Sequence, residues 1–326
     1  MKKKEMIEKA PIRFAPYFKS VIWGGERICR YKGIGQDEDN IGESWEVSAV
    51  PGHESVVVEG TYKGIRITEL IERFGPELLG RDVYERYEGK FPLLVKLIDA
   101  NDNLSVQVHP DDELARKRHG SLGKSEMWYI IQADEGAKIY SGLNREMTPD
   151  EYVRMVEENT IEEALAVHHS HPGDIFFLPA GRVHSIGAGN LLAEIQESSD
   201  ITYRIYDYDR RDAHGNPREL HTEQAKDAID YTFHEEYRSA PADEAIANAM
   251  IAECDHFRVH RLLVDGEMRH SLSGSSFTVV MCLQGDVVLE YEGGDMAMRA
   301  GETVLLPAAM TSFVLKGRGM LLTARS

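Results

Sequence analysis

The sequence predicts a mainly β protein in which one β-barrel unit is used twice and helical segments are added. Two observations support this fold class. Short runs that alternate apolar and polar residues, as half-buried strands do, fill much of residues 11–62 and 91–143 and return after residue 171. In addition, "GDIFFLPAG" (173–181) and "GETVLLPAA" (301–309) each carry a glycine, five residues and a proline near the end of a β-rich half.

The first half combines strands with two helical stretches. "SWEVSAV" and "ESVVVEG" predict short strands, and residues 68–88 have apolar residues at helical spacing with a break near Gly75-Pro76. "FPLLVKLIDA" (91–100) predicts a strand, and "DDELARKRHG" predicts a short helix that ends at Gly120. "MWYIIQADEGAKIYSGL" predicts a hairpin that turns at Asp-Glu-Gly.

Two helix-start signals predict a small helical insert at about residues 144–168. Thr148 and Thr160 are each followed three residues later by a glutamate, which is the capping-box spacing. The proline after Thr148 suits the first helical position. We therefore expect two short helices, over 148–158 and 160–167.

The same patterns predict the domain organisation. Residues 1–221 form an N-terminal unit that includes the insert and carries the candidate site. Residues 222–254 form a helical or irregular connector, and residues 255–326 form a β-rich C-terminal unit.

Composition excludes several classes of protein. The chain has 326 residues with 37 Lys and Arg against 55 Asp and Glu, a net charge of −18, which argues against nucleic acid as a partner. Three widely spaced cysteines (Cys29, Cys254 and Cys282) suit free thiols in a reducing compartment. No apolar run approaches a membrane span, and the first lysines precede no apolar segment. We expect a cytoplasmic protein without a membrane partner; the sequence leaves monomer and homodimer open.

Polar side chains gather around one predicted strand and the turns that follow it. In "LSVQVHP", Ser105, Gln107 and His109 alternate with valines and share one face of a strand. Glu126 starts the strand in "GKSEMWYII", and His184 follows a Pro-Ala-Gly turn. Two imidazoles, a carboxylate and an amide oxygen without a thiolate fit Zn²⁺, and also Fe, Mn or Co.

Each of these residues also has a structural interpretation. A single strand histidine is usually a satisfied core or surface residue, and we interpret the histidines at 168, 169 and 171 as a solvated loop. Arg204 could pair with Asp207 or Asp209, and Lys96 could pair with Asp99 or extend to solvent. Trp23 and Trp45 suit the core better than a sugar platform. The joint arrangement around the turn favours a site over these alternatives.

The motifs resemble a known family. "GDIFFLPAGRVHSIGAG" has the spacing Gly-x5-Pro-x-Gly-x2-His of the second cupin motif. "LSVQVHPDDELA", "GKSEMWYI" and "SSDITYRIYDYDR" together with it resemble type I phosphomannose isomerase in its short bacterial form. "FKSVIWGGERI" and "IGESWEVSAV" fit the family's opening motifs, so the resemblance runs from about residue 14 to the end. It implies two cupin-type (jelly-roll) barrels.

The resemblance also implies an activity, a cofactor and residue roles. The family interconverts mannose 6-phosphate and fructose 6-phosphate, so the implied partner is a phosphorylated hexose. The implied cofactor is one Zn²⁺ per chain, with other divalent metals as alternatives. The residues that match the family's metal ligands are Gln107, His109, Glu126 and His184. The residues that match its catalytic arginine, its pocket lysines and its substrate serine are Arg204, Lys96, Lys124 and Ser105.

The chemistry of an aldose–ketose isomerase fits these residues. Moving a proton between C1 and C2 through an enediol develops an oxyanion, which a metal or a fixed guanidinium such as Arg204 stabilises. Basic residues in an acidic protein suit capture of a sugar phosphate dianion. For the general base, Lys124 is our first candidate because nearby positive charges favour its neutral amine, and Glu194 is the second.

Three alternatives stay open at this stage. A non-catalytic sugar-binding cupin would not need Arg204 and Lys124, and this chain has both. An Fe(II) cupin dioxygenase usually has His-x-His where this chain has Gln107 and His109. An isomerase of another phosphorylated sugar fits the residues equally well. The second Gly-x5-Pro turn has Ala309 and Ser312 in place of the glycine and histidine, so we expect a degenerate barrel that is kept for packing or for closing the site.

Overall fold

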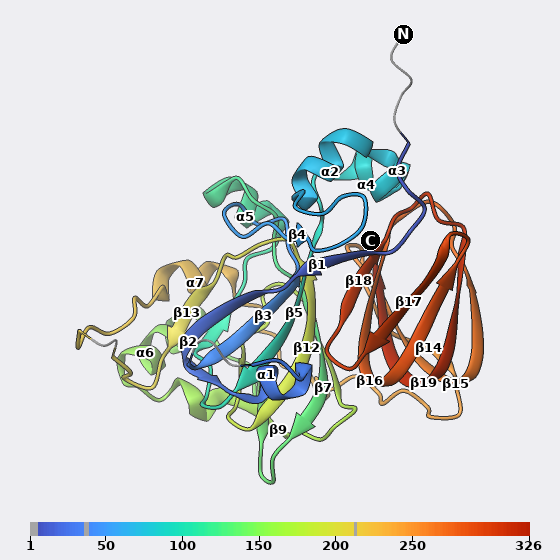
Figure 1. The fold of residues 1–326 in the computed structure, drawn as a ribbon. Helices are drawn as coiled ribbons and strands as arrows, with labels where there is room; N and C mark the ends of the chain where they lie inside the picture. The colour runs from blue at the N-terminus through green and yellow to red at the C-terminus, as the bar shows by residue number, and fades with distance from the viewer. Residues whose placement is uncertain (1–5, 36–38, 212–213) are drawn as a thin grey trace.

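The computed structural model describes residues 6–35, 39–211 and 214–326, and it is mainly β, with cupin-type antiparallel sheets as the sequence predicts. Figure 1 shows the strands of the C-terminal unit, in orange and red, beside the unit formed by the earlier strands. Helices α2 (Ile67–Phe74), α3 (Pro76–Leu79) and α4 (Arg81–Arg86) lie at one end of the junction between the two units.

The N-terminal unit contains two antiparallel sheets. The six-stranded sheet has the order β10-β7-β12-β5-β3-β2, and the five-stranded sheet has the order β13-β6-β11-β8-β9. Strands of the first are β2 (Tyr17–Gly25), β3 (Ile41–Val47), β5 (Leu93–Ala100), β7 (Glu126–Ala133), β10 (Ile175–Leu178) and β12 (Asn190–Glu197). Strands of the second are β6 (Val106–Val108), β8 (Lys138–Leu143), β9 (Leu165–His169), β11 (His184–Ile186) and β13 (Tyr203–Tyr206).

Side-chain alternation explains how the six-stranded sheet can be buried on both faces. In β5, Val95 and Leu97 join one buried cluster, whereas Ile98 and Ala100 join a second cluster with Trp128. This second cluster also contains Ile139 and Ile186 of the five-stranded sheet, so it is the core between the sheets. Trp23 and Trp45 are both buried, and Trp23 also lines the cavity described below.

Three of the predicted helical features are confirmed. The helical stretch breaks at Gly75, which has φ of 48°, and α3 begins at Pro76. Helix α5 (Asp112–His119) ends before Gly120. In α6 (Pro149–Glu157), the Thr148 side chain accepts a hydrogen bond from the Glu151 N–H, which confirms Thr148 as the N-cap, whereas the Glu151 carboxylate pairs with Arg145 at 2.7 Å. The remaining helices are α1 (Arg27–Lys32) and α7 (Thr222–Ala228).

The second capping box is wrong. Thr160 makes no side-chain cap, and only a 3₁₀ turn, η1 (Ile161–Ala164), follows it. The chain then enters β9, which pairs with β8 and places His168 opposite Ile139. His168 and His169 are therefore strand residues rather than a solvated loop, because their backbone pairs with β8. The same pairing replaces the predicted helix over 160–167, since a short isolated helix is marginal.

The C-terminal unit is an eight-stranded sheet. Seven of its strands follow the order β14-β15-β19-β16-β18-β1-β4, and β17 pairs with β16. Its strands are β14 (Asn248–Glu253), β15 (Arg258–Ser271), β16 (Thr278–Tyr291), β17 (Gly294–Arg299), β18 (Thr303–Leu306) and β19 (Ser312–Arg325). β14 lies where we expected helical or irregular connector. Two strands from the start of the chain, β1 (Ile12–Ala15) and β4 (Val56–Val57), complete this sheet. The domain boundaries stay a prediction.

Over the described ranges, no helix has both the length and the apolar character that a membrane span requires.

Candidate metal centre and its cavity

The candidate ligands come from both sheets of the N-terminal unit and meet between them. Glu126 begins β7 and belongs to the same face as Trp128, whose side chain is in the core between the sheets. Gln107 lies in β6, and its neighbours across the sheet are His184 of β11 and Arg204 of β13. The inward faces of the two sheets therefore bring the predicted ligands together.

The two histidines are held in the same tautomer. His109 Nδ1 donates to the Ile201 carbonyl at 2.8 Å, and His184 Nδ1 donates to the Arg182 carbonyl at 2.8 Å. Each Nε2 atom therefore carries a free lone pair. Burial lowers the pKa of His184 to about 3, and burial together with the Lys124 charge lowers the pKa of His109 well below its ordinary value. Both rings are neutral at physiological pH, as metal ligands must be.

Glu126 lies between these lone pairs. Its Oε1 is 3.2 Å from His184 Nε2, and its Oε2 is 3.6 Å from His109 Nε2 and 3.1 Å from Lys124 Nζ. Neither oxygen has a hydrogen bond of good geometry within the described residues, although the side chain is buried. Burial raises the pKa of Glu126 to about 7, despite the opposing charge of Lys124.

These atoms fit a divalent cation. One ligand atom from each of His109, Glu126 and His184 lies within 4.8 Å of the others. Gln107 Nε2 is 3.3 Å from His184 Nε2, and a half-turn of this amide, whose two ends are nearly isosteric, would present its oxygen there instead. Lone pairs that face one another in a dry site repel unless a cation lies between them. A cation at this place would therefore explain why the buried Glu126 oxygens and His109 Nε2 have no hydrogen-bond partner among the described residues.

The predicted turn positions His184 through a glycine. Gly181 has φ of 89°, a backbone conformation that residues with a Cβ atom rarely adopt. Its N–H donates to the His109 carbonyl at 2.9 Å. The turn that leads to His184 is thus hydrogen-bonded to the segment that carries His109.

A cavity of about 380 Å³ lies beside these ligands. It is lined by Ser105, Gln107, Lys96, Lys124 and Arg204, so the structure brings every predicted substrate and catalytic residue to one place. The lining has five basic and three acidic residues, in a protein whose net charge is −18. The cavity is therefore a local basic site in an acidic protein, as the sequence predicts.

Lys96 has different partners from those considered for it. Its Nζ lies 3.0 Å from Glu194 Oε1 and 3.5 Å from Glu43 Oε2, so it neither pairs with Asp99 nor extends to solvent. Glu43 also accepts a hydrogen bond from the Trp45 indole at 2.7 Å. The Lys96 and Lys19 charges and this hydrogen bond outweigh burial and lower the pKa of Glu43 to about 2.

Among the described residues, Arg204 forms no ion pair with Asp207 or Asp209, the partners that would make it structural. Asp207 instead accepts from Arg210 at 2.6 Å and from Arg218 at 2.7 Å. Arg204 Nη1 donates to the Glu219 carbonyl at 2.9 Å, and its Nε is buried without a partner in the described chain. The guanidinium is held in place and keeps a donor for a ligand in the cavity.

The sequence argument missed further cavity residues. The acidic and basic ones are Glu43, Asp200, Lys19 and Arg218. Glu43 had a signal, because it shares a strand face with Trp45 two residues away in "IGESWEVSAV". Lys19 lies within β2 on the same face as Val21 and Trp23, which also line the cavity, whereas Asp200 and Arg218 lie in loops whose contacts depend on the tertiary fold.

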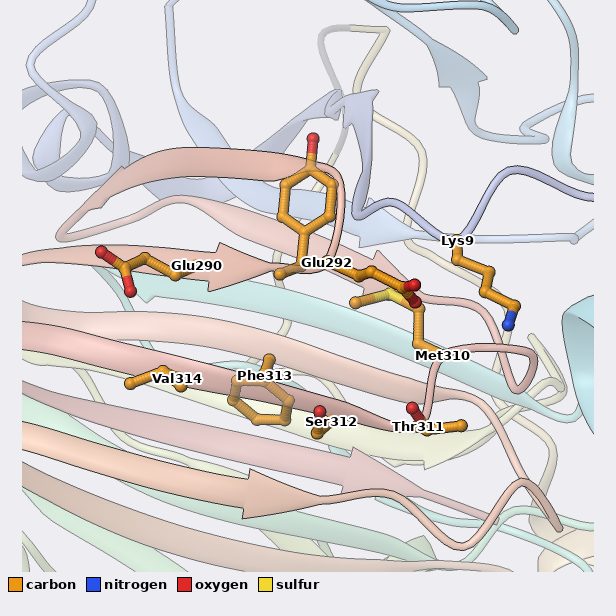
Figure 2. A pocket seen from close by; sticks show the side chains of 9 residues that line it. Lys9, Glu290, Glu292, Met310, Thr311, Ser312, Phe313 and Val314 are labelled. Atoms are coloured by element: carbon orange, nitrogen blue, oxygen red, sulfur yellow. The ribbon is translucent and has the colours of Figure 1, made fainter.

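The equivalent turn of the C-terminal unit forms no such site. Ser312, which corresponds to His184, is exposed at the rim of a surface pocket of about 280 Å³, and Figure 2 shows it beside Thr311 and Phe313. Met310 and Phe313 are buried in the apolar interior of that unit. No imidazole lines this pocket.

Two family models and several known proteins match this chain. The family model described as phosphomannose isomerase type I, catalytic domain, matches residues 12–147, and that described as mannose-6-phosphate isomerase, cupin domain, matches residues 247–325. The chain is 36% identical to mannose-6-phosphate isomerase ManA of Bacillus subtilis, over 94% of this chain and 96% of that protein. It is also 36% identical to the mannose-6-phosphate isomerase of Streptococcus mutans, over 91% of this chain and 92% of that protein.

Solved structures agree with this comparison. The crystal structure of the mannose 6-phosphate isomerase from Bacillus subtilis aligns with a TM-score of 0.87 and 34% identity, covering 96% of this chain and 99% of that chain. A structure from Archaeoglobus fulgidus aligns with a TM-score of 0.80 at 24% identity, which shows the same fold.

Proposed function

This chain belongs to the type I phosphomannose isomerase family and is an isomerase of that class, and from this premise we propose how its own residues work. The proposed reaction interconverts mannose 6-phosphate and fructose 6-phosphate through a cis-enediol, with one catalytic cation per chain. The observation that carries the proposal is the convergence of unprotonated His109 and His184 nitrogens on the orphaned Glu126 carboxylate, beside a basic cavity.

The residues that would hold the cation are Gln107, His109, Glu126 and His184. One imidazole pair, one carboxylate and one amide oxygen suit Zn²⁺, and Mn²⁺ or Co²⁺ as alternatives. When bound, such an ion supplies Lewis-acid stabilisation of negative charge on the substrate oxygens. The Nδ1–H bonds to Ile201 and Arg182 fix both rings in the tautomer that this requires.

Arg204 is proposed to stabilise the enediolate oxyanion and to orient the substrate. Its guanidinium lines the cavity, has an unpartnered Nε and is held by the Glu219 carbonyl. A planar guanidinium can donate two parallel hydrogen bonds to an oxyanion, which a lysine ammonium cannot. Burial is the main cause of a lowered pKa for Arg204. Because the pKa of arginine is normally far above physiological pH, the side chain stays charged.

Lys124 and Glu194 are the candidates for moving the proton between the two substrate carbons. Lys124 Nζ lies 3.1 Å from Glu126 Oε2 at the cavity, and Glu194 Oε1 lies 3.0 Å from Lys96 Nζ. Glu194 is ionised, because the nearby Lys96 and Lys124 charges outweigh burial and lower its pKa. We retain Lys124 as the first candidate, because it lies beside the proposed cation site.

Substrate binding is proposed to rest on the basic lining. Lys96 and Ser105 are both buried at the cavity, where a sugar hydroxyl or phosphate oxygen could meet them. The lining carries an excess of positive charge, so a dianionic phosphorylated hexose is attracted there although the protein as a whole is acidic. The cytoplasmic location and the choice between monomer and homodimer stay predictions.

The first experiment is a coupled assay of fructose 6-phosphate formation from mannose 6-phosphate. We expect activity in the native protein, loss after chelation and return with zinc. A protein with its metal site filled but without activity on mannose 6-phosphate would contradict the proposed substrate, and other hexose phosphates would then be compared.

A second experiment addresses the enediol. Turnover in deuterated water, followed by NMR, should place deuterium from solvent at the reacting carbon, because a base exchanges its proton with water. Products free of deuterium at all substrate concentrations would instead favour a direct hydride shift. The Lys124→Gln and Glu194→Gln variants then identify the base, since only the base variant should abolish exchange.

A further inference from the structure

A second cluster of potential metal ligands lies at the junction of the two units. One ligand atom from each of Asp112, Glu197 and His256 lies within 4.8 Å of the others. Asp112 is the first residue of α5, Glu197 is the last residue of β12, and His256 lies between β14 and β15. None of the three lines the cavity described above. The cluster therefore joins donors from both units at a place that the proposed reaction does not use.

Glu197 is the most deeply buried member of this cluster, with a relative exposure of 2%. Its Oε1 accepts a hydrogen bond from the Ser125 N–H at 2.8 Å. Its Oε2 lies 3.1 Å from His256 Nδ1, yet neither of these two atoms has a hydrogen bond of good geometry in the described part of the chain. A buried carboxylate oxygen and a buried imidazole nitrogen thus face each other unsatisfied, which is the situation also found at Glu126 and its histidines.

The two carboxylates of the cluster have an imidazole, but no lysine or arginine of the described residues, as an ion-pair partner. Asp112 Oδ1 accepts a hydrogen bond from the Gly123 N–H at 2.8 Å. Over residues 6–35, 39–211 and 214–326, no lysine or arginine forms an ion pair with Asp112 or Glu197; the nearby Arg86 donates instead to the Asp255 carbonyl at 2.6 Å. Burial, and then the Asp112 charge, raise the pKa of Glu197 to about 7. Two carboxylates this close require a shared proton or a cation.

We propose that Asp112, Glu197 and His256 bind a second divalent cation, which ties the C-terminal unit to the N-terminal unit. One imidazole nitrogen with carboxylate oxygens suits Zn²⁺ or Mn²⁺ better than Ca²⁺ or Mg²⁺, which prefer oxygen ligands alone.

The position of this site gives the ion a positioning role. Asp112 holds the Gly123 N–H, and Glu197 exchanges hydrogen bonds with Ser125 through both its side chain and its backbone. Gly123 and Ser125 flank Lys124 and lead directly into Glu126. An ion at the junction therefore fixes the segment that carries two residues of the proposed active site, and it does so from outside the cavity.

Metal content tests the proposal without reference to activity. The protein is stripped with a chelator, loaded with zinc, dialysed and analysed by mass spectrometry. We expect two ions per chain in the wild type and one in Glu197→Gln or His256→Ala. Because loss of an outer-sphere partner already weakens metal binding by about 10- to 100-fold, loss of a ligand should weaken this site at least as much. The matched control is His260→Ala, which removes a half-buried histidine of β15 that is hydrogen-bonded to Asn248 of β14, and it should keep two ions.

The same variants separate this site from the catalytic one. In His184→Ala, zinc should still raise the melting temperature, and adding Glu197→Gln should remove that effect. One ion per chain in the wild type, or a second ion that Glu197→Gln leaves in place, overturns the proposal and favours a proton shared between Asp112 and Glu197. If the variants fail to fold, anomalous diffraction at the zinc edge from wild-type crystals decides, because a peak must lie between Glu197 and His256.

Discussion

The two barrels use the same architecture for opposite purposes. The interior of the N-terminal barrel buries ionisable groups, including Lys96, Glu194, Glu126 and the histidines at 109 and 184. The interior of the C-terminal barrel is an apolar cluster in which Leu289, Leu315 and Val304 have no exposed surface. Buried charges cost solvation free energy that apolar residues would not, so a protein concentrates them where chemistry needs them.

The two Gly-x5-Pro turns share this spacing, yet they make different contacts. In the N-terminal unit, the Gly181 N–H bonds to His109 and the turn delivers His184 to the interior. In the C-terminal unit, the N–H groups of Ala308 and Ala309 donate at 2.9 Å to carbonyls of α3. One turn therefore positions a ligand, whereas the other docks its barrel onto the helices of the N-terminal unit.

The largest expected effect is the difference between replacing a metal ligand in one barrel and replacing the residue at the equivalent position of the other barrel. His184→Ala should lower kcat/KM by about 10³-fold or more, because Lewis-acid stabilisation is worth several kcal/mol and each 1.4 kcal/mol is tenfold in rate. Ser312→Ala should leave kcat/KM unchanged, since Ser312 is exposed. Steady-state kinetics with zinc analysis measures both. Equal activity of the two variants would show that the turns are not functionally different.

A smaller effect is expected at the arginine of the cavity. Arg204→Lys keeps the charge but loses the forked donor, and we expect kcat to fall by about 10²- to 10³-fold, as for the loss of an oxyanion donor. Arg269→Lys replaces an exposed arginine of the C-terminal barrel and serves as the control. A rise in KM alone for Arg204→Lys would instead assign this residue to substrate binding.

The sequence predicted the fold class because alternation and the repeated Gly-x5-Pro turn are local signals. It also identified Gln107, His109, Glu126 and His184 as a group, since strand periodicity and a turn glycine place them. It failed at Thr160, where pairing of β9 with β8 outweighed a helix-start signal. It could not find the partners of Lys96, or the junction cluster, because these contacts join segments that only tertiary packing brings together.

Destabilising the apolar barrel should separate stability from catalysis. Leu315→Ala removes a fully buried side chain, and we expect the free energy of unfolding to fall by about 2–5 kcal/mol. We expect kcat at 25 °C to stay within about twofold, since this cluster contains no residue of the proposed site and typical stability reserves exceed such a loss.

Urea unfolding followed by two probes measures this effect. The three tryptophans, Trp23, Trp45 and Trp128, all lie in the N-terminal unit, so fluorescence reports that unit and far-UV circular dichroism reports both. Coincident transitions would show that the barrels unfold together. A matching loss of kcat would show that the C-terminal barrel shapes the active site, which would contradict the division of roles drawn above.

The last prediction is the pH dependence of zinc binding at the catalytic site of the N-terminal barrel. Glu126 has a pKa of about 7 in the free site, so it is protonated at pH 6 and must lose that proton when zinc binds. The pKa of His184 is about 3, so its ring is already neutral and releases none. Zinc affinity should therefore rise about tenfold per pH unit between pH 5 and 7 and level off above.

Titration calorimetry of Glu197→Gln, in buffers of different ionisation enthalpy, isolates the catalytic site and should give close to one proton released at pH 6 and close to none at pH 8.5. Release of two or more protons at pH 6 would mean that the histidines are charged in the free protein, and the desolvated interior that distinguishes this barrel would then be the wrong explanation for its chemistry.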